Sequence, residues 1–132
     1  MIQSSPFLRR VLLADTIFSG AGAVSFTLGA GILANLTELP ETLSRETGLV
    51  LILYTALVGW LAMRSAMPRA WIAFVIVING AWTIASIALL LSDAIHPNLL
   101  GEIVVVLQAA ATGVLAELQY LGLRRSHGAI AA

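Results

Sequence analysis

Long apolar runs separated by short polar breaks dominate this chain. They place four candidate membrane-crossing helices at about residues 8–36, 47–65, 69–92 and 98–124. At 1.5 Å per residue, about 20 residues cross the hydrocarbon layer, so each segment is long enough or nearly so. Transmembrane strands would alternate polar and apolar residues, and these segments do not. The pattern predicts an all-α polytopic membrane protein, with residues 1–132 forming a single four-helix transmembrane domain.

Local sequence signals sharpen the limits of these helices. Pro68 lies where the first helical turn tolerates proline, and Asn98 is suited to cap the last helix. The first segment is long enough to tilt, or to break near residues 29–31. The longest connection is residues 37–47, whose part 41–46 predicts a turn or two of amphipathic helix on the outer surface.

The arginines are distributed unevenly between the two ends of the predicted bundle. One end holds six of the seven, namely Arg9, Arg10, Arg64, Arg69, Arg124 and Arg125. The other end holds Arg45 together with five carboxylates, Glu38, Glu41, Glu46, Asp93 and Glu102. Since basic residues favour the cytoplasmic side of a membrane, both termini are expected to be cytoplasmic.

Composition agrees with a lipid environment and removes several functional classes. The chain is 59% hydrophobic and 11% charged, with a mean hydropathy of +0.95, whereas soluble domains carry about 25% charged residues. Its net charge of zero gives no electrostatic case for binding nucleic acid. There is no Cys, and neither histidine lies in a predicted helix, so we expect no metal, no haem and no other cofactor. Serines within the helices have no embedded His or Lys base, which argues against an enzyme.

Two carboxylates lie inside the predicted helices. Asp15 follows Arg10 by five residues and Glu117 precedes Arg124 by seven, which puts both roughly 7–11 Å inside the arginine-rich end. An ionisable residue at such a place is a functional-site hypothesis by default. If the first and fourth helices are neighbours, the two carboxylates could face each other and share a proton, as a proton-coupled carrier requires. Alternatively each pairs with a snorkelling arginine as an orientation anchor, which their shallow depth favours.

Uncharged polar residues gather near the predicted bilayer centre. Asn79 and Gln108 each lie ten residues inside their helix, roughly 15 Å deep. The whole group is Ser19, Tyr54, Thr55, Asn79 and Gln108. Such a layer can line a binding site or permeation path. The simpler interpretation is interhelical hydrogen bonding, worth about 0.6 kcal/mol per contact.

One side of the first helix forms a helix-packing seam. Asp15, Gly22 and Gly29 recur every seven residues, and Ser19 and Phe26 fall between them on the same side. This spacing is typical of left-handed helix packing with close backbones. Packing inside the bundle is one use of the seam, and a homodimer through it is the alternative.

Four short helices with an acidic residue early in the first resemble the small multidrug resistance transporters. The resemblance rests on Leu12-Leu13-Ala14-Asp15, where that family carries Glu, and it departs at Asn79-Gly80-Ala81-Trp82, where the family has a Trp-Ser-Gly signature. More broadly, Trp60-Leu61-Ala62 and Ala116-Glu117-Leu118-Gln119 are similar to small bacterial integral membrane proteins without an assigned activity. That similarity implies the bacterial inner membrane and brings no activity.

Together these features favour a non-enzymatic membrane protein that acts by helix association, as an auxiliary subunit or a homo-oligomer. The alternative is a transporter or channel for a small solute or ion, proton-coupled or not, that uses its intramembrane carboxylates. The expected partners are membrane lipids and a second copy or another membrane protein.

Overall fold

Five helices make up most of this chain, in a computed structural model that describes residues 1–128. They are α1 (Pro6–Leu28), α2 (Ala30–Thr37), α3 (Glu41–Met63), α4 (Arg69–Leu91) and α5 (Leu99–Arg125). Three two-residue strands complete the fold, β1 (Ile2–Gln3), β2 (Ala66–Met67) and β3 (His127–Gly128). Helices α1, α3, α4 and α5 are long and apolar enough to cross a membrane. The all-helical class and the four candidate spans expected from the sequence are confirmed.

The first apolar segment forms two helices instead of one, because α1 ends at Gly29. The Gly29 N–H donates to the Ser25 carbonyl, and the Gly29 carbonyl accepts from the Leu33 N–H at the beginning of α2. A Cβ atom at position 29 would lie 2.6 Å from the Ser25 carbonyl oxygen, so the local geometry requires glycine.

Helix α3 begins earlier than residue 47, the limit expected from hydropathy. Pro40 precedes it, and Glu41 places an acidic side chain in its first turn, where the helix dipole favours negative charge. The Arg45 guanidinium also pairs with the Glu41 carboxylate at 2.8 Å, one helical turn apart. The segment 41–46 is therefore the first turns of α3 and not a separate surface helix.

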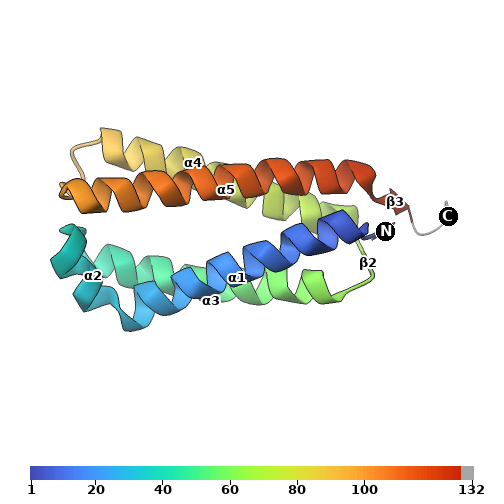
Figure 1. Cartoon of the computed structure of the whole chain (residues 1–132), viewed down its shortest axis with the longest axis horizontal. Helices are drawn as coiled ribbons and strands as arrows, with labels where there is room; N and C mark the ends of the chain where they lie inside the picture. The colour runs from blue at the N-terminus through green and yellow to red at the C-terminus, as the bar shows by residue number, and fades with distance from the viewer. Residues whose placement is uncertain (129–132) are drawn as a thin grey trace.

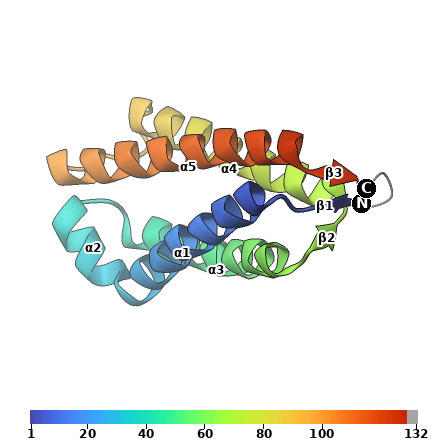
Figure 2. The same ribbon diagram turned by 45° about the vertical axis from the view of Figure 1, so that its right-hand side comes forward.

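The four long helices form two antiparallel pairs (Figures 1 and 2). Helix α1 packs most extensively against α3, and α4 packs most extensively against α5. The two pairs meet mainly where α1 contacts α5. The short α2 lies at one end of the bundle, which we call the α2 end, and contacts both α3 and α5.

The main hydrophobic core lies at the opposite end, which we call the terminal end because it holds β1, next to the N-terminus, and β3, the last element that the structure describes (Figure 1). The three strands form a small sheet at this end in the order β2-β1-β3, and both pairings are antiparallel. The buried core residues are Ile2, Leu8, Leu12, Tyr54, Val58, Leu61, Ala62, Met67, Ile72, Val75 and Leu123. This core joins both helix pairs and the sheet.

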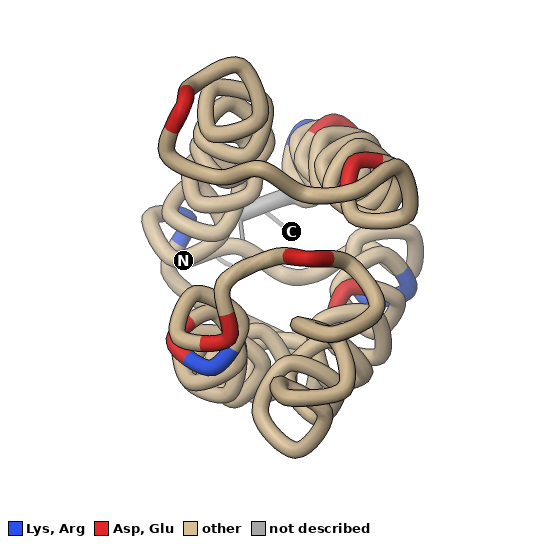
Figure 3. Tube along the Cα trace, turned by 90° about the vertical axis from the view of Figure 1, so that its left-hand side faces the viewer, with Lys and Arg blue, Asp and Glu red and all other residues tan. Residues whose placement is uncertain are grey.

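At the α2 end the two pairs are joined by a smaller set of contacts. The Asn98 N–H donates to the Thr37 carbonyl at 3.1 Å, and the Asn98 side-chain amide donates to the Leu36 carbonyl at 2.8 Å. A small cluster of Leu39, Ile95 and Val105 is buried beside them. Figure 3, viewed from this end, shows acidic positions in the segments nearest the viewer.

Candidate functional site

Asp15 is the centre of a buried polar cluster, and the geometry of α1 puts Ser19 beside it. Residues four apart lie on the same face of a helix, and the Ser19 hydroxyl donates to Asp15 Oδ1 at 2.8 Å. Asp15 has no exposed surface and Ser19 keeps 4%. Apolar residues of α1, including Leu12 and Val11, share this buried face, so the carboxylate points into the protein.

Each of the other three long helices contributes one hydrogen-bond donor to Asp15. The Tyr54 hydroxyl of α3 donates to Asp15 Oδ2 at 2.5 Å, and the Gln119 amide of α5 donates to the same oxygen at 2.6 Å. The Asn79 amide of α4 completes the set at 3.1 Å. One carboxylate is thus bonded to every membrane-length helix of the chain.

The Asn79 amide also links the other members of this polar cluster to one another. Its Nδ2 atom lies 2.9 Å from the Tyr54 hydroxyl oxygen and 2.8 Å from Gln119 Oε1, so both can accept from it. The cluster of Asp15, Ser19, Tyr54, Asn79 and Gln119, which we call the Asp15 cluster, is a closed network, because members bond to each other as well as to the carboxylate. Low dielectric surroundings strengthen such a network and make an unpaired member costly.

No cation compensates Asp15 within residues 1–128. The salt bridge that the structure shows in this range joins Arg45 to Glu41, far from the cluster. Four neutral donors surround the carboxylate instead, the pattern that suits an ionised acid, which can only accept. The arrangement can therefore hold a buried negative charge. It can also neutralise that charge by binding a proton or a small cation.

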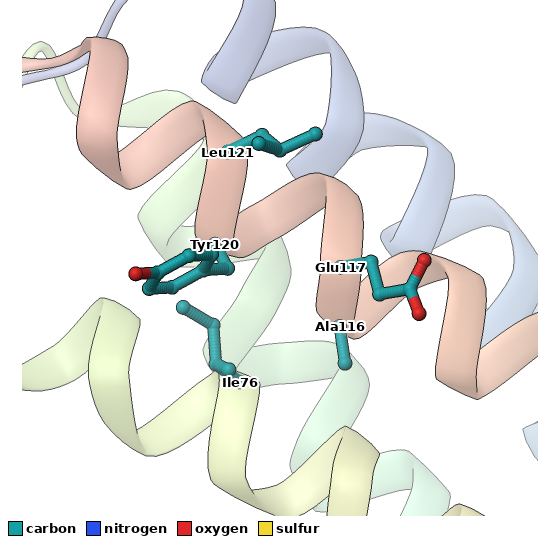
Figure 4. Close-up of a pocket in the computed structure, with 5 residues that line it drawn as sticks. All are labelled: Ile76, Ala116, Glu117, Tyr120 and Leu121. Atoms are coloured by element: carbon teal, nitrogen blue, oxygen red, sulfur yellow. The ribbon is translucent and has the colours of Figure 1, made fainter.

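Glu117 lies elsewhere. It is exposed on α5 and lines a shallow open pocket with Ile76, Ala116, Tyr120 and Leu121 (Figure 4). Gln119, two residues further on, faces Asp15 instead, since two residues turn an α-helix by about 200°. The structure does not bring the two carboxylates together, and it pairs neither of them with an arginine among the described residues.

The expected midplane layer divides into two groups. Ser19, Tyr54 and Asn79 belong to the Asp15 cluster, as described above. Gln108 lies in a second group, where the Trp82 indole N–H donates to its Oε1 at 2.7 Å and its Nε2 donates to the Ser86 hydroxyl at 2.9 Å. The Thr55 hydroxyl is buried without a hydrogen-bond partner in the described part of the chain.

The small-residue seam of α1 packs against α3 of the same chain. A Cβ atom at Gly22 would lie 3.1 Å from the Leu51 side chain, which shows close contact there. The two backbones also come close at Gly48 of α3, where an added Cβ would lie 2.7 Å from the Thr27 nitrogen. Phe26 is half-buried beside this contact, and Gly29 ends the helix. The structure thus uses the seam inside the bundle.

Gln119 is the cluster member that sequence reasoning did not single out. It has no exposed surface and bonds to both Asp15 and Asn79. Its signal was its spacing, because it follows Gln108 by three helical turns and therefore shares a face with that residue.

Comparison with known proteins finds no family model, no curated protein and no solved structure that matches this chain. The limited resemblance to the small multidrug resistance transporters gains no support from it.

Proposed function

We propose that this chain is a non-enzymatic membrane transporter of a small cation. The cation is a proton or an alkali metal ion, and it binds at Asp15 and neutralises the carboxylate. The observation that carries the proposal is the buried carboxylate with one neutral donor from each of α3, α4 and α5. A cation at Asp15 would act on all four long helices at once.

The choice of residue at position 15 supports transport over helix association alone. Burying a carboxylate in a membrane-spanning segment costs several kcal/mol, whereas Asn or Gln can join helices without a charge. The Asp15 cluster already contains two such amides, Asn79 and Gln119. A charge that assembly does not require is a feature of ion and proton pathways.

Neutralising Asp15 would change the hydrogen bonds that join the helices. Oδ2 accepts from Tyr54, Asn79 and Gln119. A proton on Oδ2 turns that atom into a donor, so these three contacts cannot all persist. An alkali metal ion would instead draw on the oxygens of Asp15, Ser19 and Tyr54, because hard cations prefer oxygen ligands. Either event weakens the links between the helix pairs, which is the coupling that transport requires.

The proposal includes an orientation in the membrane. Six of the seven arginines belong to the terminal end, and aromatic rings lie beside them. The Arg64 guanidinium is 4.8 Å from the Trp60 ring centroid, and that of Arg125 is 4.6 Å from the Phe7 ring centroid. Arginines favour the cytoplasmic side and aromatic residues gather at membrane interfaces, so we place both termini in the cytoplasm, and the protein in a bacterial inner membrane.

The test uses the purified full chain in liposomes, with entrapped dyes for pH, Na⁺ and K⁺. A gradient of each ion is imposed in turn, and flux is compared for the protein, for Asp15→Asn and for Glu117→Gln. Asp15→Asn should abolish flux of one ion, because a neutral amide cannot bind and release a cation as a carboxylate does. Glu117→Gln is the matched control, since it removes the other membrane-depth carboxylate from an exposed position outside the cluster, and it should keep that flux.

Flux that persists in Asp15→Asn contradicts the proposal, as does a protein that carries none of the three ions. In the second case, association with another membrane protein, the other function expected from the sequence, would take its place.

A further inference from the structure

The geometry points to one-sided access to Asp15: the carboxylate is reached from the α2 end along uncharged polar side chains and is closed off from the terminal end. This inference rests on the proposed function and names the route that the cation takes.

The terminal side of Asp15 is apolar and tightly packed. Leu8 and Leu12 of α1 have no exposed surface, and neither do Val58 and Leu61 of α3 or Ile72 and Val75 of α4. Met67 of β2, also without exposed surface, joins this layer to the three-stranded sheet. All the side chains named in this layer are apolar.

The α2 side of the cluster carries hydroxyl and amide groups instead. The Thr83 hydroxyl donates to the Asn79 carbonyl at 3.1 Å and lies 2.7 Å from the Thr112 hydroxyl. About one turn further along, Gln108 bonds to Ser86 and Trp82. We call Thr83, Thr112, Gln108, Ser86 and Trp82 the polar track.

The polar track follows the cluster along both α4 and α5. Residues 79, 83 and 86 follow one another at helical intervals on α4, and residues 108, 112 and 119 do so on α5. The track carries no charge of its own, so it offers a cation or a proton-bearing water hydrogen-bonding partners without trapping it.

The half of α4 near the terminal end is more deeply buried than the half near the α2 end. Its buried residues are Ile72, Val75 and Asn79, all in the half near the terminal end. From Gly80 to Leu91 no residue of this helix is fully buried. Trp82, Thr83 and Ser86 are half-buried, as is Gln108 opposite them. The side chains of the polar track are therefore less enclosed by the protein than those of the apolar layer on the terminal side of Asp15.

The chain contains no cysteine, so single cysteines can report access without altering any native thiol. The track variants are Ser86→Cys and Thr112→Cys, with Thr83→Cys as the replacement for either that does not fold. The matched controls are Leu12→Cys and Val75→Cys, which lie on the other side of Asp15. Each protein is exposed in sealed vesicles to a membrane-impermeant thiosulfonate from one side at a time, and a terminal tag identifies the side.

We expect the track cysteines to react at least ten times faster than the control cysteines, and only from the side opposite the termini. Equal rates for track and control cysteines overturn the inference, and so does faster reaction of the track from the terminal side.

Labelling does not depend on flux, so the two proposals can fail separately. One-sided labelling without ion flux removes the transport function and keeps the access route. Flux that requires Asp15, with labelling of the track from neither side, keeps the transport function and removes the access route.

Discussion

The hydrogen bond between Gln119 and Asp15 provides a direct measure of the charge at the centre of the bundle. Gln119 Nε2 lies 2.6 Å from Asp15 Oδ2, and both side chains are without exposed surface. We take the double-mutant cycle formed by Asp15→Asn, Gln119→Met and the two together. Asn keeps the shape and an oxygen acceptor at position 15, while Met keeps the length of Gln119 and removes its amide.

The expected coupling follows from what each variant removes. A hydrogen bond to a charged group contributes about 1.5–3 kcal/mol, and a neutral one about 0.5–1.5 kcal/mol. Because Asn leaves a neutral bond in place, the cycle isolates the difference, about 1–1.5 kcal/mol. The parallel cycle of Asp15→Asn with Gln108→Met is the control. Gln108 bonds to Trp82 and Ser86 and not to Asp15, so its effects should add to within about 0.5 kcal/mol.

Unfolding free energies come from titration of detergent-solubilised protein with sodium dodecyl sulfate, followed by the fluorescence of the three tryptophans. If the coupling between positions 15 and 119 is no larger than in the Gln108 cycle, Asp15 does not carry the charge that we assign to it. The account of the cluster as a cation site would then be refuted.

Three further substitutions test the packing and capping of the helices. Gly48→Ala should destabilise the protein by about 1–3 kcal/mol, because its Cβ would lie 2.7 Å from the Thr27 nitrogen, whereas Gly80→Ala meets nothing within 4 Å and should be neutral or stabilising by up to about 1 kcal/mol. The same titration measures both, and equal effects would argue against the close approach of α1 and α3. Asn98→Ala should cost about 1–2 kcal/mol, because its Oδ1 caps the Gly101 N–H and its amide holds α2; a thermal midpoint unchanged from that of the parent protein would contradict this role.

Hydropathy was sufficient to predict the four long helices, because lipid-length apolar runs have few other stable forms. Hydropathy was less informative about the residues at which the helices begin and end. The break at Gly29 falls within residues 29–31, where glycines weaken the helix, but the beginning of α3 at Glu41 depends on Pro40 and on the pair between Glu41 and Arg45. Such end effects involve polar residues that a hydropathy pattern counts as loop.

The composition of the site was harder to predict than the helices, because it depends on how each helix is rotated about its axis. Counting from Arg10 places Asp15 near the terminal end, yet it does not tell whether the side chain faces lipid, an arginine or the bundle. On α5 the charged residue, Glu117, attracts attention, while the uncharged Gln119 is the one that meets Asp15. A distance along the helix axis is available from sequence, whereas a rotation is set by packing.

The Asp15 cluster lies between the two helix pairs, and this location bears on the transport that we propose. Asp15, Ser19 and Tyr54 belong to the pair α1 and α3, while Asn79 and Gln119 belong to the pair α4 and α5. The cluster's contacts between the pairs all run through these two amides, and two of them end on Asp15 Oδ2. Neutralising Asp15 therefore weakens the polar contacts between the pairs, together with the Tyr54 contact inside the pair α1 and α3. The apolar core still joins the two pairs at the terminal end, and the Asn98 bonds to Leu36 and Thr37 still join them at the α2 end, so the loss falls on the polar contacts around Asp15.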